Sequence, residues 1–385
     1  MSEPGNDKIF RFFKKTIEEE KKKAEDNIEK NKEIKRVNNF IIIEGEKGLI
    51  GKGGYGEVRR VEFNGKKYAA KLIKLKKGDI NESESVQKFR GQGLVKINKT
   101  FNERYDGNNY SLIIMEESPL KSIEEFKINL KDIGENLLRY FIKQLIHGLE
   151  ILYRNSLQHF DIKPRNILIF PKLIVKWTDF GLLRSLDQIK IDKTNKVKIP
   201  GGTPGYFSPE YYQFLSEIDE KDAIKQDFFA FGATIYYLKY GERMLEYNEF
   251  KTDNENSGQN YPKNAELIID LIERAMDKIK SDKKSDSEFI KFLTRLIHYK
   301  PSERPNFEEI YRNKWVNKNS EEIKNINEIN RVFVEQKMVN ELNKSDFLIK
   351  KRDYIYKKRE EENIYYNRKN MYNKHKFIIK PKKKK

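Results

Sequence analysis

The segment Ile50-Gly51-Lys52-Gly53-Gly54-Tyr55-Gly56-Glu57-Val58 contains glycines in the spacing G-x-G-x-x-G. Glycine-rich loops let backbone N–H groups approach phosphates, and we predict this role for Gly51, Gly53, Gly54 and Gly56. The spacing alone fits several kinds of phosphate-binding loop, and the residues that follow it distinguish between them. In Rossmann and Walker loops the glycines open a helix, whose N-terminus holds the phosphates.

The residues after the glycines follow a strand period instead of a helix period. Apolar residues alternate on both sides of Asn64-Gly65, at positions 61 and 63 before it and 68, 70 and 72 after it. Asn-Gly between alternating runs is a strong hairpin signal, so we predict that the glycine loop joins two strands. A Walker loop is excluded because Glu46 stands at its first glycine position and no Ser or Thr follows Lys52.

Lys71 lies in the second predicted strand, on the same face as Ala69. Burying an unpaired ammonium group is costly, so a lysine at this position should have an acidic partner. Residues 80–90 have the spacing of a short helix, with Glu82 on its apolar face. We predict an ion pair between Lys71 and Glu82, with Glu84 as the alternative partner.

A second group of polar residues surrounds another predicted hairpin. Residues 167–170 and 173–178 are strand-like and are separated by Pro171-Lys172. Because the chain goes out and returns, Asn166 and Asp179 should lie side by side at one end of the hairpin. An amide oxygen and a carboxylate suit Mg²⁺, which takes hard oxygen ligands and completes its shell with water and phosphate.

Asp161 and Lys163 precede this hairpin in the chain. We expect Asp161 to accept a hydrogen bond from a substrate hydroxyl and to orient it for in-line attack. Lys163 can neutralise charge on the transferred phosphate. Together with the glycine loop and Lys71, these residues indicate phosphoryl transfer.

Taken in order, these motifs resemble the signature set of eukaryotic protein kinases, over about Phe40 to Trp315. The resemblance implies an α+β, bilobal fold with a small β-rich N-lobe and a larger helical C-lobe. It places the N-lobe at residues 40–115, the hinge at 116–118 and the C-lobe at 119–315. Charged extensions would occupy residues 1–39, read as helical, and 316–385.

The resemblance implies ATP and Mg²⁺ as cofactors and assigns residues to the nucleotide. Lys71, held by Glu82, would grip the α and β phosphates. Asn166 and Asp179 would hold Mg²⁺. Adenine would be enclosed by apolar side chains next to a gatekeeper methionine and would meet the backbone of the hinge: Ile50, Val58, Ala69, Leu168, Met115, Glu116 and Ser118.

For catalysis, the resemblance makes Asp161 the base and predicts that Thr203 contacts Asp161 and Lys163. Lys163 after the catalytic aspartate is the serine/threonine-type pattern, so the acceptor is expected to be serine or threonine. His159 could act as a base from its side chain alone, but the resemblance implies that it packs under Phe180.

Three further segments of the C-lobe match the family. Ser208-Pro-Glu210 stands in place of Ala-Pro-Glu, and Arg304 is expected to pair with Glu210. Asp227 is expected near the start of the large C-lobe helix. Phe160 departs from the pattern, because many kinases have an arginine there that pairs with a phosphorylated activation loop. We therefore hypothesise that activity does not depend strictly on phosphorylation of residues 182–207.

Composition sets limits on the remaining possibilities. The 385 residues include no cysteine, which excludes disulfides, thiolate nucleophiles and cysteine-ligated zinc. No segment approaches the roughly 20 apolar residues of a membrane span, and the N-terminus lacks the apolar stretch of a secretory signal. We expect an intracellular protein without a transmembrane segment, located in the cytoplasm and also, through its basic tail, in the nucleus.

The net charge of +18 is concentrated at the C-terminus. Residues 350–385 contain 15 Lys and Arg but only 4 Asp and Glu, so this tail is a candidate for contact with a polyanion or an import receptor; the alternative is a solvated charge run. The charged segment Lys8–Val37 has roughly helical apolar spacing and is predicted to be an exposed helix. The polar run Lys239–Ser287 is predicted to be a loop-like insertion.

The leading prediction is a serine/threonine protein kinase that transfers the γ-phosphate of Mg-ATP to protein hydroxyls. The main alternative is a pseudokinase, a nucleotide-binding scaffold with the same fold and little turnover. A third hypothesis makes the basic tail a nucleic-acid-binding element. The folded region carries no pattern of aromatic and basic residues that would stack bases, which disfavours it. The protein substrate, the upstream activator and the oligomeric state have no signal in the sequence.

Overall fold

The computed structural model describes residues 34–37, 39–53, 56–75, 93–105, 107–125, 134–191, 194–213, 217–245 and 265–318. All of them belong to the first of two compact units, Met1–Ser320. Four predictions lie outside the described residues: the helix before residue 34, the contacts of Gly54, the helix with Glu82 or Glu84, and the basic tail.

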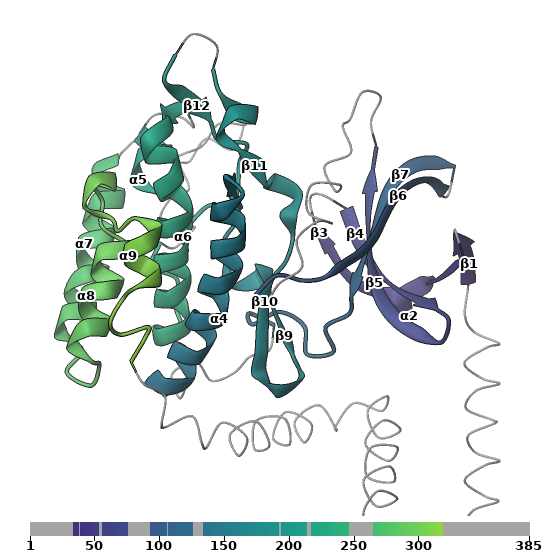
Figure 1. Ribbon diagram of the computed structural model, residues 1–385, viewed down its shortest axis with the longest axis horizontal. Coiled ribbons are helices and arrows are strands. Elements are labelled where there is room, and N and C mark those ends of the chain that lie inside the picture. The colour runs from purple at the N-terminus through teal and green to yellow at the C-terminus, as the bar shows by residue number, and fades with distance from the viewer. Residues whose placement is uncertain are drawn as a thin grey trace, which may run out of the picture. The chain divides into compact units, whose positions relative to one another are not determined.

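The N-lobe is a seven-stranded antiparallel sheet in the order β1-β2-β4-β5-β7-β6, with β3 paired to β4 (Figure 1). One helical turn, α2 (Gly45–Gly48), separates β2 from β3. The strands are β1 (Ile34–Val37), β2 (Phe40–Ile43), β3 (Leu49–Gly53), β4 (Gly56–Phe63), β5 (Lys66–Lys74), β6 (Ile97–Tyr105) and β7 (Asn108–Glu116).

The turn between β4 and β5 confirms the predicted hairpin. Asn64 has φ 49° and Gly65 has φ 69°, the left-handed conformation that tight two-residue hairpin turns require. The glycine loop therefore lies between two strands, β3 and β4, which pair as far as Gly53 and Gly56.

The prediction of a helix through Val37 was wrong for its last residues. Residues 34–37 form strand β1, which pairs with β2 across a turn at Asn39, where φ is 66°. Val37 is buried in the N-lobe core. A short amphipathic segment fits both the helix period and the strand period. Here, pairing with the apolar strand β2 buries the side chain of Val37. The N-lobe thus begins before residue 40.

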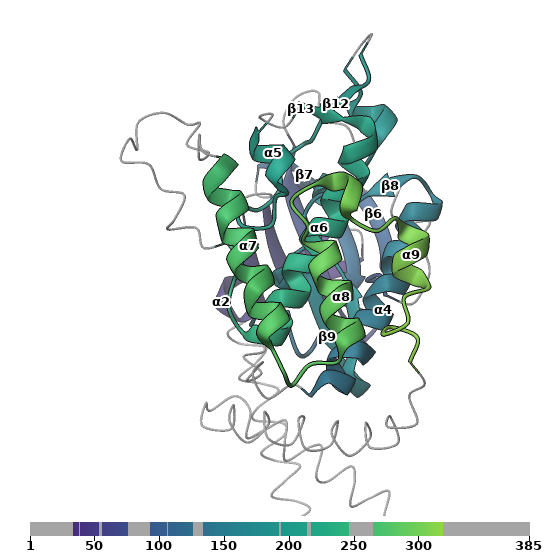
Figure 2. The ribbon, with the colours of Figure 1, turned by 90° about the vertical axis from the view of Figure 1, so that its left-hand side faces the viewer.

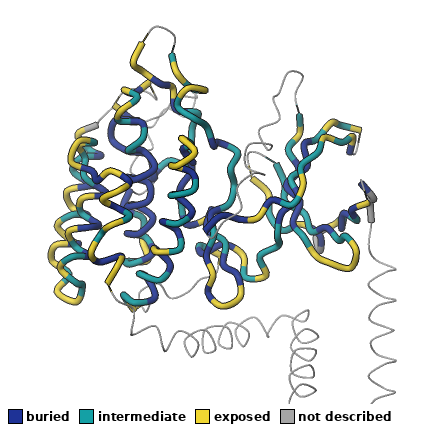
Figure 3. The backbone as a smooth tube through the Cα atoms, viewed as in Figure 1, coloured by how far each residue is buried: buried dark blue, intermediate teal, exposed yellow. Residues whose placement is uncertain are grey.

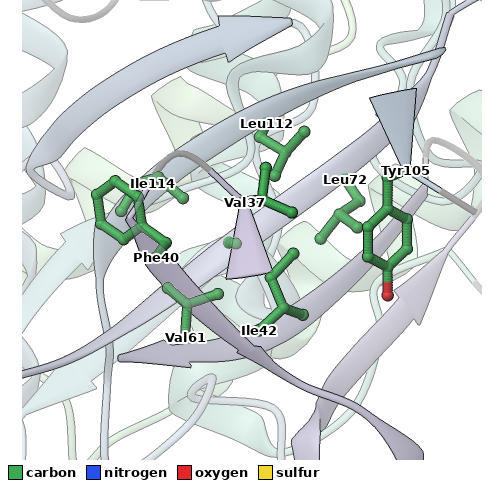
Figure 4. Close-up of a cluster of buried hydrophobic side chains, with 9 residues drawn as sticks. Val37, Phe40, Ile42, Val61, Leu72, Tyr105, Leu112 and Ile114 are labelled. Carbon is green, nitrogen blue, oxygen red and sulfur yellow. The ribbon is translucent and has the colours of Figure 1, made fainter. Parts of the chain in front are cut away.

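The N-lobe core lies on one face of the sheet (Figure 4). Ala70 and Leu72 of β5 point into it beside Val61 and Ile114, and all four are fully buried. Because side chains alternate along a strand, Lys71 projects from the opposite face, as predicted.

The C-lobe is mostly helical, so the predicted division into a β-rich and a helical lobe is confirmed (Figures 1 and 2). Its helices are α4 (Glu135–Arg154), α5 (Pro209–Gln213), α6 (Glu220–Tyr240), α7 (Ala265–Ser281), α8 (Ser287–Leu296) and α9 (Phe307–Tyr311). Its short strands are β8 (Leu157–Gln158), β9 (Ile167–Phe170), β10 (Ile174–Trp177), β11 (Arg184–Ser185), β12 (Lys196–Lys198) and β13 (Glu217–Asp219). Single 3₁₀ turns are η2 (Pro164–Asn166), η3 (Pro171–Leu173), η4 (Phe180–Leu182), η5 (Leu186–Ile189) and η7 (Pro301–Glu303).

Helix α6 is the buried centre of the C-lobe and contacts α4 and α8 (Figure 3). It begins at Glu220, earlier than the predicted start near Asp227, because residues 220–226 continue the same helix. It ends at Tyr240 and is capped by Gly241, whose φ of 73° is the left-handed conformation of a helix C-cap.

Helix α7 contradicts the prediction of a loop across Lys239–Ser287. It spans Ala265–Ser281, and its buried residues Ile268, Leu271, Ile272, Ala275 and Ile279 recur at helical spacing. The polar composition of the run had concealed this stripe. Residues 246–264 of the predicted insertion lie outside the described residues.

The end of the lobe closes on Trp315, as expected. Its indole is fully buried against Phe289 and Phe292 of α8. The indole N–H donates to Glu135 at the start of α4, over 2.7 Å. This contact joins the last described segment to the first helix of the lobe.

Candidate active site

The glycine loop has room for a ligand at two positions and a steric requirement at a third. A Cβ atom at Gly51 or Gly53 would meet no described atom within 4 Å. A Cβ at Gly56 would lie 2.1 Å from the carbonyl oxygen of Leu72, and φ there is 134°. Gly56 is therefore needed for the packing of β4 on β5, whereas no atom of the described residues fills the space at Gly51 and Gly53.

The residues predicted to enclose adenine gather in one apolar cluster that both lobes build. Ala69 and Met115 are buried in it, and Ile50, Val58 and Leu168 pack against it. The cluster also contains residues that sequence reasoning missed: Val95, Ile113 and Phe170. Phe170 shares a face of β9 with Leu168, so period-two alternation could have found it.

The hinge residues are fixed by contacts on both sides. The Glu116 N–H donates to the Lys96 carbonyl over 3.1 Å, so this N–H is not available to a ligand. The Glu116 carboxylate accepts hydrogen bonds from Lys176, at 2.6 Å, and from the Lys96 N–H, at 2.7 Å. The Ser118 hydroxyl donates to the Ile169 carbonyl over 2.5 Å.

Among the described residues, Lys71 forms an ion pair with Asp179; the predicted partner helix with Glu82 or Glu84 lies outside them. Its Nζ lies 2.5 Å from Asp179 Oδ1, and the lysine is 8% exposed. Burial raises the pKa of Asp179, but the charge and hydrogen bond of Lys71 outweigh it, and the net pKa lies below the ordinary value. The carboxylate therefore stays ionised opposite the ammonium group.

The hairpin β9–β10 brings the two predicted magnesium ligands to one end. Ile167 pairs with Trp177, and the Thr178 N–H donates to the Asn166 carbonyl over 2.9 Å. Asn166 precedes the first strand of this hairpin and Asp179 follows the second, so their backbones are neighbours. This arrangement is the one that the sequence predicted.

The orientation of the Asn166 amide suits a cation. Its nitrogen donates to the Asp161 carbonyl, at 2.8 Å, and to Asp161 Oδ2, at 3.0 Å. The amide oxygen is thus the atom left for another partner. No group of three His, Cys, Asp or Glu that could hold a metal ion occurs among the described residues. The chemistry of Asn166 and Asp179 fits Mg²⁺, because an amide oxygen and a carboxylate are hard oxygen ligands of the kind that this ion takes beside water and phosphate.

Helix α6 holds the loop that precedes the β9–β10 hairpin through hydrogen bonds to the backbone of the loop. The buried Asp227 carboxylate accepts hydrogen bonds from the N–H groups of His159, at 2.6 Å, and Phe160, at 2.9 Å. Phe160 has φ 59°, an unusual conformation for a bulky residue, and its side chain is buried. These two bonds stabilise the bend that presents Asp161.

His159 is a packing residue in this structure. The Asp161 N–H donates to its Nδ1 over 3.3 Å, so the proton is on Nε2, which donates to the Thr178 carbonyl over 3.1 Å. The ring is fully buried, 5.5 Å from the ring of Phe180. Both nitrogens are engaged, which agrees with the predicted structural role.

The Asp161 carboxylate is oriented by three donors. Lys163 Nζ lies 2.8 Å from Oδ2, Asn166 donates to the same oxygen, and the Thr203 hydroxyl donates to Oδ1 over 2.6 Å. Lys163 also donates to Thr203 Oγ1 over 2.5 Å. The predicted contact of Thr203 with both residues is present.

A buried ion pair fixes the segment that follows Thr203. Both guanidinium NH₂ groups of Arg304 donate to the Glu210 carboxylate, at 2.6 and 2.7 Å. Arg304 is 1% exposed and Glu210 is 4% exposed. This is the predicted pair between the Ser208-Pro-Glu210 motif and the end of the C-lobe.

Comparison with known proteins agrees with this geometry. The family described as protein kinase domain matches residues 45–316, which is more than half of the chain. The chain belongs to the protein kinase family. The match starts within the N-lobe sheet and ends next to Trp315, so it covers both lobes of this kinase domain.

Individual relatives of the kinase domain are distant. Serine/threonine-protein kinase par-4 of Caenorhabditis briggsae is 27% identical over 270 residues, which are 65% of this chain and 40% of that protein. Serine/threonine-protein kinase ATG1 of Debaryomyces hansenii is 29% identical over 204 residues, 48% of this chain and 20% of that protein. G protein-coupled receptor kinase 4 of Rattus norvegicus is 28% identical over 245 residues, 58% of this chain and 40% of that protein. The chain thus spans less than half the length of each of these curated relatives.

In the part of the kinase that the structure describes, no helix has the length and apolar character needed to cross a membrane.

The resemblance covered the catalytic motifs but missed the contacts that hold them, above all the Asp227 carboxylate. An acidic residue directly before the apolar run Phe228-Phe-Ala-Phe231 was the available signal, because a buried charge in such a helix needs partners.

Proposed function

We propose that this kinase transfers the γ-phosphate of Mg-ATP to serine or threonine hydroxyls of proteins. The observation that carries the proposal is the Asp161 carboxylate, buried to 5% exposure and oriented by Lys163, Asn166 and Thr203. A carboxylate held in this way can orient an acceptor hydroxyl and take its proton.

The nucleotide side follows from the apolar cluster and the ion pair. Adenine would lie among Ile50, Val58, Ala69, Met115 and Leu168, and would meet the backbone of Glu116 and Ser118. Lys71, supported by Glu82, would bind the α and β phosphates, next to the backbone N–H groups of Gly51, Gly53, Gly54 and Gly56. Mg²⁺, held by Asn166 and Asp179, would supply positive charge at the phosphates.

The acceptor side rests on Lys163 and Thr203. Lys163 places an ammonium group within 2.8 Å of the Asp161 carboxylate, where it can neutralise charge that develops on the transferred phosphate. Thr203 ties the end of the segment 182–207 to the same carboxylate. The serine/threonine preference, the intracellular location and contact of the basic tail with polyanions or import receptors are proposals from the sequence.

The decisive experiment is Asp161→Asn in a peptide-array phosphorylation assay with Mg-ATP. The amide keeps the shape but cannot take a proton, so turnover should fall by about 10²–10⁴-fold, the usual contribution of a general base. Nucleotide binding, measured by thermal shift, should change little. Asp270→Asn is the matched control. Asp270 lies at a half-exposed position on α7 and is not assigned to the site, so this variant should keep full turnover.

The array also separates the proposal from its alternative. Wild-type protein that binds Mg-ATP but phosphorylates no peptide would contradict the proposal and would favour a pseudokinase. Equal rates for wild type and Asp161→Asn would show that the assigned base is wrong. Phosphorylation of tyrosine peptides alone would contradict the serine/threonine assignment.

A further inference from the structure

Helix α6 carries two consecutive buried polar residues that bind different parts of the site. Gln226 is 2% exposed and Asp227 is 4% exposed. Asp227 holds the backbone of His159 and Phe160. Successive residues of a helix point about 100° apart, so Gln226 reaches another segment.

That segment is Tyr206–Ser208, directly after the peptide that carries Thr203. Gln226 Oε1 accepts hydrogen bonds from the Ser208 hydroxyl, at 2.6 Å, and from the Ser208 N–H, at 3.0 Å. Gln226 Nε2 donates to the Tyr206 carbonyl over 3.3 Å. Ser208 is fully buried, so all of these bonds lie in a low-dielectric interior, where an unmade bond is costly.

These contacts close a ring around the acceptor side of the site. From Gln226 the ring runs through Ser208 to Thr203, whose carbonyl accepts from the Tyr206 N–H over 3.1 Å. From Thr203 it continues to Asp161, and Asp227 returns it to α6. Close packing supports the same path, because a Cβ at Gly202 would lie 2.7 Å from the Phe160 carbonyl oxygen.

We propose that Gln226, through Ser208, is a positioning residue for the phosphate acceptor, and this rests on the proposed function. One peptide unit of α6 separates the residue that holds the catalytic loop from the residue that holds the Thr203 segment. Consecutive Cα atoms are 3.80 Å apart in any trans peptide, so the helix sets the spacing between these two parts rigidly. The Ser208 hydroxyl supplies a bond that an alanine at this position could not make.

The ring predicts an effect on the acceptor more than on ATP. None of the residues in the ring is assigned to adenine, to the α and β phosphates or to Mg²⁺. The link to those groups is the hydrogen bond from Asn166 to Asp161. A displacement of about 1 Å in a reacting group can cost about 10²-fold in rate. Loss of Gln226 should therefore act on peptide phosphorylation.

The test compares Gln226→Met with wild type in the full-length protein. Methionine keeps the length of the side chain and removes its polar atoms. We expect kcat/KM for a peptide substrate to fall by about 10–100-fold, while KM for ATP changes by less than about 2-fold. Water is the acceptor in ATP hydrolysis, so this reaction should be affected less. Its fold-loss in the variant should be smaller than that of peptide phosphorylation by a factor of at least about 10.

A second variant and a control make the test independent of folding. Ser208→Ala removes one of the three hydrogen bonds and should lower peptide kcat/KM by about 3–10-fold. In the Gln226→Met background it should have little further effect, because the two residues share the bond. Tyr236→Phe, on the same helix, removes a hydrogen bond to Glu242 and should leave peptide and ATP kinetics unchanged.

The outcomes separate this inference from the proposed function. Equal losses of ATP hydrolysis and peptide phosphorylation in Gln226→Met, or a raised KM for ATP, would overturn it. If that variant does not fold, an unchanged peptide kcat/KM in Ser208→Ala would overturn it as well. A wild-type protein without any peptide phosphorylation would instead contradict the proposed function and, with it, this inference.

Discussion

The sheet of the N-lobe and helix α6 of the C-lobe each support one side of the site, but they differ in the polarity of the side chains that they bury. In the N-lobe, Val61, Leu72 and Ile114 are fully buried among other apolar side chains (Figure 4). In the C-lobe, α6 also buries polar groups: Gln226 and Asp227 each hold backbone or hydroxyl groups of a segment next to the site.

This difference corresponds to what each side must do. Apolar burial is non-directional and roughly proportional to area, so it stabilises the sheet without fixing the orientation of any one group. Hydrogen bonds depend on angle and distance, so they can hold a carboxylate such as that of Asp161 in one orientation. The part of the site that has to align reacting atoms lies where the interior is polar.

The largest effect on stability should come from the buried ion pair of the C-lobe. Arg304→Met leaves the Glu210 carboxylate buried without its partner, and the free energy of unfolding should fall by about 3–5 kcal/mol, measured by urea denaturation. Arg295→Met breaks a pair with Glu309 in which both side chains are exposed, at 50% and 44%, and should cost only about 0–1 kcal/mol. Similar losses in the two variants would contradict the assigned role of burial.

A smaller effect is expected in the N-lobe core. Ile114→Val removes one methylene group from a fully buried site on β7 and should cost about 0.5–1.5 kcal/mol. Ile174→Val, on the exposed side chain at the start of β10, should change stability by less than about 0.5 kcal/mol. A loss at Ile114 as large as that of Arg304→Met would remove the contrast between the two interiors.

The smallest effect concerns a polar contact near the surface of the C-lobe and depends on pH. Hydrogen bonds from Lys318 and from the Glu288 N–H, at the start of α8, lower the pKa of Asp286 below its ordinary value of 3.8. Because the folded pKa lies below the unfolded one, this contribution is complete above pH 3.8 and is lost as pH falls through the folded pKa. Asp286→Asn should therefore lose less stability than wild type on acidification below that pH.

Urea denaturation at several pH values checks this prediction. Asp270→Asn, at a half-exposed pair on α7, is the control and should follow the wild-type curve. Identical curves for wild type and Asp286→Asn would contradict the assigned contact with Lys318.

The elements that could be predicted were those with local signals. The hairpin around Asn64-Gly65 and the strands β9 and β10 follow from alternation and turn residues within about ten positions of each other. The placement of Lys71 opposite Leu72 needed nothing beyond the period of a strand. The segments 34–37 and 265–281 were predicted wrongly because a short or polar stretch fits more than one period until its burial is known.

The site was predictable in its residue types and only partly in its contacts. The pairs Asp161–Lys163 and Asp161–Asn166 are close in the chain, and the hairpin geometry fixes Asn166 next to Asp179. The contacts of Lys71 with Asp179 and of His159 with Asp227 join residues 108 and 68 positions apart. No local pattern records such partners.

The sequence by itself determined the β4–β5 hairpin of the N-lobe, the order of the catalytic motifs and the chemistry of their side chains, because these depend on residue type and short-range periodicity. Only the tertiary structure decided which charged partner Lys71 has in the described residues, and that α6 holds both the catalytic loop and the Thr203 segment. The physical reason is burial: a polar group inside the protein has to find its partner in space, whatever the distance along the chain.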